Sequence, residues 1–391
     1  GFAAAKDTLC ASTNTAKTHI RNLIFFIIFT LSLNSILIIY ILAKREDFGK
    51  KSLNSHHNVI CQNKIFRYNE ITMKEYAIGI DLGGTKVLIA LVNKTTGEVV
   101  NFVKKKTKKD KGPKNIIRKM TEGIEELLEI TAVNKEDISS IGVGAAGQVD
   151  RENGILIGAP NLDCYDLNIK EQLSTHFSLP VFLGNDVEIA TIGEQKFGAG
   201  KGCNDFVCIF VGTGVGSSIV KNGEIVLGST GTAGEIGHII VDLNGRPCAC
   251  GAHGCLEAYA SRSAIERRIE GALKKGRQSV ILEYLESGKS ITSSMIQKSI
   301  ERGDELVKSC VDEASEYLSG GIASIINFIN PKLIVLGGGL IEAVDYFYQT
   351  TIKKAKAKSL PVPASKIQFK KAALGDFSGV IGAAFLEDRK I

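Results

Sequence analysis

Residues 231–257 read GTAGEIGHIIVDLNGRPCACGAHGCLE, a glycine-rich stretch with one histidine and three cysteines at close spacing. Together these supply the four nitrogen and sulfur ligands of a closed, tetrahedral structural zinc site. The four ligands would be His238, Cys248, Cys250 and Cys255. Three unrelated buried thiols are the alternative, but a Cys-x-Cys flanked by glycine and proline does not suit a helix or strand core. The spacing therefore predicts structural Zn²⁺, with His253 as an alternative nitrogen ligand.

The composition is that of a globular protein with more than one domain. The 391 residues are 44% hydrophobic and 23% charged. Most of the formal charge of +6 comes from residues 1–72, so residues 73–391 are about neutral and no nucleic-acid-binding surface is expected there. Of the nine cysteines, the six outside this motif are scattered, several of them in apolar runs. This pattern favours a reducing compartment and a cytoplasmic location.

Residues 23–43 form an uncharged, mostly apolar run, LIFFIIFTLSLNSILIIYILA, that is long enough to span a bilayer. Basic residues follow it and weakly favour a cytoplasmic location for the rest of the chain. Two interpretations stay open. Either the run anchors the protein at the cytoplasmic face of a membrane, or residues 1–72 are an extension upstream of Met73 that the working protein does not need.

From Met73 onward the pattern alternates between strands and helices. Apolar runs at 76–81 and 87–92 flank a Gly-Gly turn and predict a β-hairpin. The apolar run FVCIFV at 206–211 begins a second set of elements. Further strands are expected at 138–144, 180–184 and 333–336, and helices at 114–131, 187–197 and 304–330. Two α/β halves with similar beginnings indicate an internal structural duplication.

Three glycine-rich turns follow predicted strands: DLGGTK at 81–86, GTGVG at 212–216 and GGG at 337–339. Backbone N–H groups in such turns can approach an anion closely. Each turn alone is more often a hairpin connection. Three of them at strand ends are typical of α/β folds that bind phosphates and nucleosides. The P-loop pattern GxxxxGK[ST] is absent from the sequence.

The segment GVGAAG at 142–147 matches the dinucleotide-binding pattern GxGxxG and follows a predicted strand. The next residues, QVDRENG, are typical of a turn and not of a helix. The helix N-terminus that would hold a pyrophosphate is therefore missing. We reject a dinucleotide site at this position.

These motifs resemble those of the ROK family (repressor, open reading frame, kinase), which includes sugar kinases of the actin/hexokinase-like ATPase fold. The resemblance covers about residues 73–385. It rests on DLGGTK at 81–86, LGND at 183–186, VGTGVGS at 211–217, GSTGTAGEIGH at 228–238 and CACGAHGCLE at 248–257. It implies a two-lobed α/β enzyme of duplicated RNase H-like domains with a structural zinc loop. Sugar and ATP would bind in the cleft between the lobes.

The resemblance also implies roles for individual residues. Asp186 would be the catalytic base, and Asp81 would hold Mg²⁺ through water. Sugar would be bound by Gly147, Asn161, Asn185, Asp186, Glu235, His238 and Glu257. ATP would be bound by Asp81, Gly83, Gly84, Thr85, Lys86, Thr213, Gly214, Gly337 and Gly338. From the residues alone, Asn185 and Asp186 could instead form a turn that caps a helix starting at Val187, and the two glutamates could be solvated turn carboxylates.

Two departures from the family pattern lie beside the expected sugar site. Ala146 stands where proline is usual, and Val187-Glu188 stands where Ala-Asn is usual. Both positions are close to the expected sugar contacts. They therefore bear on which sugar is bound more than on the chemistry.

The expected organisation has three parts. These are the extension 1–72, an N-terminal lobe of residues 73–195 completed by a C-terminal helix at 376–391, and a C-terminal lobe of residues 196–375 with the zinc site. The expected function is ATP-dependent phosphorylation of a hexose, most simply of the 6-hydroxyl of glucose. The cofactors would be ATP, Mg²⁺ and structural Zn²⁺, and a homo-oligomer (dimer or tetramer) is expected.

Other functions compete with this expectation. An N-acetylmannosamine or N-acetylglucosamine kinase is the near alternative. A non-catalytic sugar-responsive regulator is a second class, because the family includes repressors. Those repressors carry an N-terminal helix-turn-helix, where this chain has an apolar run and a polar linker. A membrane-anchored sensor would rest on residues 23–43 alone, whereas Asp81 and Asp186 favour turnover.

Overall fold

The computed structural model describes residues 74–107, 112–285 and 290–388, which belong to one compact unit. The apolar run at 23–43 and the rest of the N-terminal extension lie outside the described residues. Among the helices within the described ranges, none has the length and apolar composition needed to cross a membrane.

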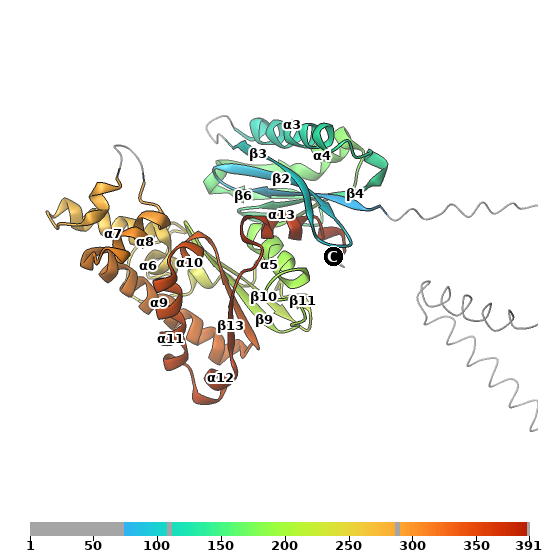
Figure 1. The fold of residues 1–391 in the computed structure, drawn as a ribbon. Helices are drawn as coiled ribbons and strands as arrows, with labels where there is room; N and C mark the ends of the chain where they lie inside the picture. Colours follow the sequence, from blue (N-terminus) through green and yellow to red (C-terminus); the bar gives the residue numbers. More distant parts are fainter. Residues whose placement is uncertain (1–73, 108–111, 286–289, 389–391) are drawn as a thin grey trace, which may run out of the picture. The chain divides into compact units, whose positions relative to one another are not determined.

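Five strands form the first sheet, in the order β3-β2-β1-β4-β8 (Figure 1). They are β1 (Tyr76–Leu82), β2 (Lys86–Asn93), β3 (Val99–Lys106), β4 (Ile138–Ala145) and β8 (Val181–Asn185). Strands β1 and β2 pair antiparallel, which confirms the predicted hairpin, whereas β1, β4 and β8 run parallel. Because both faces of β1 and β2 are covered, their apolar residues form nearly continuous runs and do not alternate with polar ones.

The second sheet has the equivalent order, β11-β10-β9-β12-β13. Its strands are β9 (Phe206–Val211), β10 (Val215–Lys221), β11 (Glu224–Ile225), β12 (Leu333–Gly337) and β13 (Gln368–Lys371). Strand β9 pairs antiparallel with β10 and parallel with β12, as β1 does with β2 and β4. The same order and directions in both sheets agree with the duplication expected from the sequence.

A small third sheet and two helices complete the first half. The sheet contains β5 (Gln148–Asp150), β6 (Ile155–Ala159) and β7 (Cys164–Asn168), and the helices are α3 (Pro113–Thr131) and α4 (Ile169–Phe177). Helix α3 confirms the predicted helix and begins at a proline, which suits a first helical turn. Strand β5 directly follows Gly147, so the GxGxxG pattern leads into a strand and not into a helix. This confirms the reason for rejecting a dinucleotide site.

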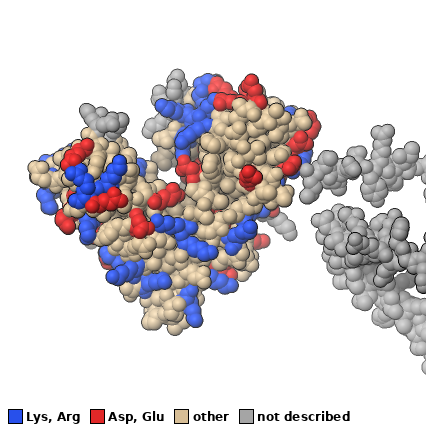
Figure 2. All heavy atoms as spheres, viewed as in Figure 1, with Lys and Arg blue, Asp and Glu red and all other residues tan. Residues whose placement is uncertain are grey.

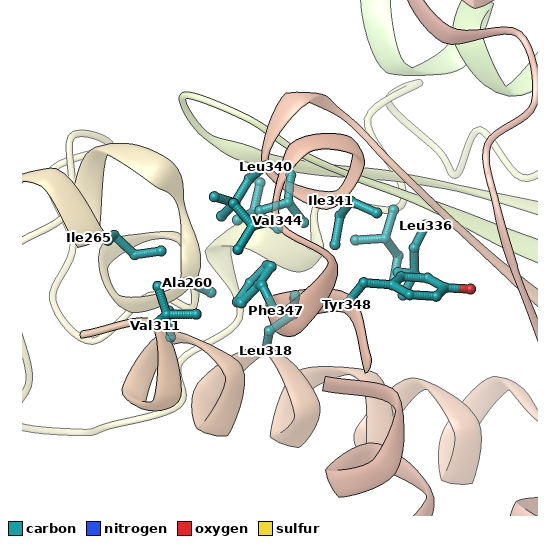
Figure 3. Close-up of a cluster of buried hydrophobic side chains, with 14 of the residues drawn as sticks. Ala260, Ile265, Val311, Leu318, Leu336, Leu340, Ile341, Val344, Phe347 and Tyr348 are labelled. Atoms are coloured by element: carbon teal, nitrogen blue, oxygen red, sulfur yellow. The ribbon is translucent and has the colours of Figure 1, made fainter. Parts of the chain in front are cut away.

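The second half has a helical layer built on α9 (Glu305–Ile329). Its other helices are α6 (Glu257–Ala260), α7 (Arg262–Lys274), α8 (Ser293–Glu301), α10 (Gly339–Ala343), α11 (Asp345–Lys358) and α12 (Pro361–Lys366). Val311 and Leu318 of α9 share one buried cluster with Phe347 of α11 and Leu336 of β12 (Figure 3). Short 3-10 turns lie at Lys135–Asp137, Pro160–Leu162, Ile236–His238, Val280–Glu283, Gly375–Phe377 and Leu386–Asp388. On the face shown in Figure 2, basic and acidic side chains are interspersed.

Two helices lie between the sheets, α5 (Asp186–Lys196) and α13 (Ser378–Ala383) (Figure 1). Helix α13 packs on β1 and β4 and against α5. These contacts need glycine. A Cβ at Gly382 of α13 would lie 1.6 Å from the backbone oxygen of Ile189 in α5, and a Cβ at Gly142 of β4 would lie 1.8 Å from a backbone oxygen of α13. The helix predicted at 376–391 is shorter than expected in the described residues, with α13 at Ser378–Ala383 between two 3-10 turns. Direct backbone contact holds α13 against β1 and β4.

Gly382→Ala is expected to destabilise the protein by about 3 kcal/mol, because the added methyl group meets backbone atoms that cannot turn away. Gly271→Ala is the matched control, since Gly271 lies within α7 and no atom of the described residues outside its helix comes within 4 Å of its Cβ position. There the same change should stabilise by up to about 1 kcal/mol through helix propensity. Urea unfolding measures both effects, and equal effects would contradict the close packing of α13.

Candidate active site

Asn185 and Asp186 stand where β8 ends and α5 begins. The side-chain oxygen of Asn185 accepts hydrogen bonds from the backbone N–H groups of Val187 (2.9 Å) and Glu188 (3.3 Å), so Asn185 is the N-cap. Asp186 occupies the first helical position, and the helix predicted to start at Val187 therefore begins one residue earlier. Asp186 is partly exposed at its surface, but burial of its carboxyl group raises its pKa above the usual range.

Two predicted sugar contacts, Gly147 and Asn161, lie in different places. The amide of Asn185 donates a hydrogen bond to the backbone oxygen of Gly147 (3.2 Å). Gly147 has no room for a side chain, because a Cβ would lie 2.3 Å from the backbone oxygen of Gly158. Asn161 is exposed, and its backbone oxygen is 3.4 Å from the Cβ position of Gly84 in the β1–β2 turn. Gly147 is thus joined to Asn185, and Asn161 lies beside the first glycine turn.

The first glycine turn, between β1 and β2, is held by local hydrogen bonds. The N–H of Gly83 donates to the backbone oxygen of Lys86 (3.0 Å). Thr107, at the end of β3, donates its N–H to the backbone oxygen of Thr85 (3.0 Å) and its hydroxyl to that of Gly83 (2.9 Å). These bonds occupy carbonyl groups of the turn and fix its shape.

Asp81 lies near the end of β1, immediately before this turn. Burial raises the pKa of its carboxyl group to about 6, the charge of Asp186 acts in the same direction, and the charge of Lys86 opposes both. Lys86 also pairs with Asp376 at 3.1 Å. One oxygen of the Asp81 carboxyl group lies 3.0 Å from the Cβ position of Gly379, so the start of α13 leaves just enough space for it. The first turn thus carries an acid that lies within electrostatic range of Asp186.

Asp81→Asn is expected to stabilise the nucleotide-free protein at neutral pH. Below the ordinary aspartate pKa the wild-type carboxyl group is protonated in both folded and unfolded chains, so the two proteins should be alike. As the pH rises from about 4 to about 6, the unfolded wild type ionises Asp81 while the folded protein keeps it protonated, so the wild type loses stability. Above about pH 6 the variant should be the more stable protein by about 2 kcal/mol. Urea unfolding near pH 4 and pH 8 measures the difference. A wild type that is the more stable protein near pH 8 would refute the desolvation argument.

The second glycine turn, between β9 and β10, contains Thr213 and Gly214. Arg262 at the start of α7 donates a hydrogen bond to the Thr213 hydroxyl (3.1 Å). Glu257 accepts a hydrogen bond from the backbone N–H of Val215 (2.9 Å), and the same oxygen lies 2.3 Å from the Cβ position of Gly214. A side chain at Gly214 would therefore displace Glu257, which the sequence assigned to sugar.

The third glycine turn lies against the second. Gly338 has a φ of +88°, a conformation that favours glycine. A Cβ there would lie 2.6 Å from the backbone oxygen of Val211, the last residue of β9. Gly337 is equally confined, because its Cβ position lies 2.7 Å from the ring of Phe210. The structure therefore brings the two predicted phosphate-binding turns of the second half together.

The histidine and three cysteines of the opening motif come together as their spacing predicts. The candidate ligand atoms of His238, Cys248, Cys250 and Cys255 all lie within 4.8 Å of one another. His238 Nδ1 is 3.8 Å from Cys248 Sγ, and the Sγ atoms of Cys250 and Cys255 are 3.7 Å apart. Among the described residues, this group contains His238 and not His253.

Glu235 and Glu257 connect this cluster to Asp186. Burial raises the pKa of Glu235, and the charges of Asp186 and Glu257 act in the same direction, whereas His238 opposes them. The second oxygen of Glu257 lies 3.9 Å from Cys248 Sγ. The predicted base, two predicted sugar-binding acids and the cluster of His238 and three cysteines therefore occupy one region of the molecule.

The ion pair between Arg151 and Glu188 was not predicted from the sequence. Arg151 Nη2 lies 2.6 Å from an oxygen of Glu188, whose residue is only 4% exposed, and the same oxygen faces the backbone N–H of Asn185 (3.4 Å). Arg151 Nη1 lies 2.4 Å from the Cβ position of Gly231, in the loop that leads to the predicted sugar site. Glu188 is one of the departures from the family pattern, and Arg151 balances its charge. The pair is 37 positions apart, so no local motif signals it.

The mixed α/β fold, with two similar sheets and a glycine turn on each, matches solved structures of sugar kinases with the actin/hexokinase-like fold. The sequence matches the ROK family over residues 77–390, and the chain belongs to that family, among its glucokinase-like sugar kinases.

The similarity extends over most of each relative. The glucokinase of Halalkalibacterium halodurans is 36% identical over 311 residues, which cover 79% of this chain and 94% of that protein. A crystal structure of a ROK family glucokinase from Streptomyces griseus, in complex with glucose and AMPPNP, has a TM-score of 0.70 at 29% identity and covers 80% of this chain and 98% of its own. The N-acetylglucosamine repressor of Escherichia coli O157:H7 is 30% identical over 318 residues, covering 78% of this chain and 75% of the repressor.

Proposed function

We propose that the protein is an ATP-dependent hexose kinase that transfers the γ-phosphoryl group of ATP to the 6-hydroxyl of glucose. The observation that carries this proposal is the position of Asp186. Its carboxyl group lies at the start of α5. It is within electrostatic range of Asp81 at the first glycine turn and of Glu235 beside the cluster of His238 and three cysteines. A carboxylate between a phosphate-binding turn and hydroxyl-binding groups is placed to receive a proton from an attacking hydroxyl.

Asp186 accepts that proton in the proposed mechanism. Phosphoryl transfer passes through a loose transition state, so the protein mainly positions the reactants and takes up one proton. A raised pKa makes Asp186 a stronger base than an exposed aspartate. The Asn185 cap fixes the start of α5 and therefore the direction of the Asp186 side chain.

The sugar is proposed to lie among the acids around Asp186. Ionised carboxylates only accept hydrogen bonds, and sugar hydroxyl groups donate them. Glu257 is already oriented by the N–H of Val215, and Glu235 lies close enough to Asp186 for their charges to interact. Asn185, His238, Gly147 and Asn161 complete the proposed sugar contacts.

ATP is proposed to bind at the three glycine turns, where backbone N–H groups can approach its phosphates. The residues are Gly83, Gly84, Thr85, Lys86, Thr213, Gly214, Gly337 and Gly338. Arg262 orients the Thr213 hydroxyl. Asp81 would hold Mg²⁺ through water, and bound Mg²⁺ supplies neutralising charge to the phosphate oxygens.

The four-residue cluster is proposed to hold structural Zn²⁺. One nitrogen and three sulfur atoms within 4.8 Å of one another suit a tetrahedral zinc ion and leave no position for a catalytic water. Burial raises the pKa of the Cys255 thiol to about 12, so that thiol must release its proton to become a ligand. Bound zinc would fix the loop that carries His238 and, through Cys248, the neighbouring Glu257.

We also propose that residues 73–195 and 376–391 act as one lobe and residues 196–375 as the other, with sugar and ATP between them. The contacts of α13 with β1 and β4 support this grouping. Oligomeric state and location stay predictions from the sequence.

The test is a coupled assay of the purified full-length chain with ATP and Mg²⁺ against glucose, N-acetylmannosamine, N-acetylglucosamine and fructose. The highest kcat/KM is expected for glucose. A higher value for an N-acetylhexosamine would keep the kinase and change its substrate. Sugar binding without turnover of any sugar would refute the kinase proposal and favour a regulator.

A further inference from the structure

Glu194, in the last turn of α5, is a fully buried carboxylate that the proposed mechanism does not use. Its relative exposure is 0%. One oxygen accepts hydrogen bonds from the backbone N–H groups of Ala199 (2.7 Å) and Ala373 (3.0 Å), and the other accepts from Ala373 and Leu374 (both 3.0 Å). A buried carboxylate is stable only when such donors replace water.

These donors lie on the two segments that connect the sheets. Residues 197–205 lead from α5 to β9, and residues 372–377 lead from β13 to α13. We call them the first and second crossing segments. Ala372 still pairs with Leu336 of β12 (2.8 Å), so Glu194 binds the second crossing segment just where it leaves the second sheet. One side chain therefore holds both passages of the chain between the sheets.

The surroundings of Glu194 are shaped for this contact. A Cβ at Gly198 would lie 2.1 Å from the Glu194 carboxylate, so only glycine lets the first crossing segment fold over it. Lys370 of β13 donates a hydrogen bond to the backbone oxygen of Ala199 (3.3 Å), which joins the first segment to the strand that precedes the second. The two segments are thus tied both to Glu194 and to each other.

We propose that Glu194 is a positioning residue for catalysis, which fixes the two crossing segments to α5 and so sets the second half relative to Asp186. Asp186 lies at the start of α5 and Glu194 in its last turn, while Thr213, Gly214, Gly337 and Gly338 lie on the second half. Displacing phosphate-binding groups from a base by about 1 Å can cost about 100-fold in rate. The kinetic part of this inference rests on the proposed kinase function.

The kinetic test compares Glu194→Gln and Glu194→Asp with wild type. Glutamine keeps one acceptor oxygen but turns an amide N–H₂ toward backbone N–H groups, and aspartate is too short to reach both segments. We expect kcat to fall by about 10-fold or more while the dissociation constant of ATP, measured without sugar, changes by less than about twofold.

Thr191→Val is the matched control. Thr191 is buried in the same helix, and its hydroxyl donates to the backbone oxygen of Val187 (2.8 Å) within α5. This variant loses a buried hydrogen bond without touching either crossing segment, so its melting temperature should fall while its kcat stays within about twofold of wild type. A Glu194→Gln protein that behaves like this control would overturn the inference.

Amide hydrogen exchange supplies a test that does not depend on turnover or on the variants folding. In the wild type, the amides of Ala199, Ala373 and Leu374 should be protected to a similar degree, because one carboxylate holds all three. Protection that differs by more than about 10-fold between the two segments would show that they open independently and would overturn the inference. If no sugar is turned over, the proposed function fails, while this measurement still decides whether Glu194 holds the two crossing segments together.

Discussion

Asp186→Asn is expected to lower kcat for glucose phosphorylation by about 1,000-fold, because an amide of the same shape cannot accept the proton of the attacking hydroxyl. The change should not unfold the protein. Burial raises the pKa of the Asp186 carboxyl group, so ionising it above its ordinary pKa costs stability in the folded state, and the neutral variant should be at least as stable near pH 8. Initial rates with saturating ATP and glucose, together with urea unfolding, measure both effects.

Asp166→Asn is the control for this experiment. Asp166 is an exposed carboxylate on β7 of the same half, and its φ of +49° is a conformation that asparagine also adopts. The kcat of the Asp166→Asn protein should stay within about twofold of the wild-type value. If Asp186→Asn kept more than about a tenth of the wild-type kcat, Asp186 would not be the base.

Cys255→Ser is expected to abolish stoichiometric zinc and to lower kcat/KM for glucose by about 100-fold. Cys255 is fully buried and lies two residues before Glu257, and its partner Cys248 contacts the Glu257 carboxylate. Without metal, the loop loses the link that holds His238 beside Glu235. The effect should appear mainly in the KM for glucose, because the ATP turns contain none of the four ligands. Metal content by mass spectrometry and steady-state kinetics measure the two effects.

Cys203→Ser provides the comparison. Cys203 is a half-buried free cysteine in the first crossing segment, outside the cluster. The Cys203→Ser protein should bind as much zinc as wild type, and its kcat and KM should stay within about twofold of the wild-type values. Wild-type zinc in Cys255→Ser would exclude Cys255 as a ligand, and loss of zinc with an unchanged KM for glucose would separate the metal from sugar binding.

Local features of the fold were predictable because they depend on residues close in sequence. The β1–β2 hairpin follows from two apolar runs around a glycine turn, and α3 follows from apolar residues at helical spacing. The cluster at His238 and Cys255 follows from ligand types and spacing within one loop. The predicted start of α5 was one residue too late, because the sequence does not tell whether Asn185 or Asp186 caps the helix.

The remaining features of the site depend on contacts between distant segments. Arg262 reaches Thr213 across 49 positions, and Glu194 reaches Leu374 across 180. Neither residue has a local signature, because Arg262 stands at the ordinary start of α7 and Glu194 lies within a run of buried residues in α5 that shows no helical pattern of polar and apolar faces. The raised pKa of Asp81 likewise results from burial and from the neighbouring charge of Asp186, far along the chain. Such properties appear only when the topology brings the segments together.

The order of synthesis gives the packing of α13 a further consequence. Gly79 and Gly142 leave the ribosome long before the backbone of α13, which packs directly against them, has been synthesised. Until then, apolar residues of the first sheet such as Ala77 and Ala90, which share a buried cluster with Val380, have no cover from this helix. A chain that ends before α13 would present this surface to other nascent chains and would aggregate. Burial of this face of the first sheet thus waits until α13 has been synthesised.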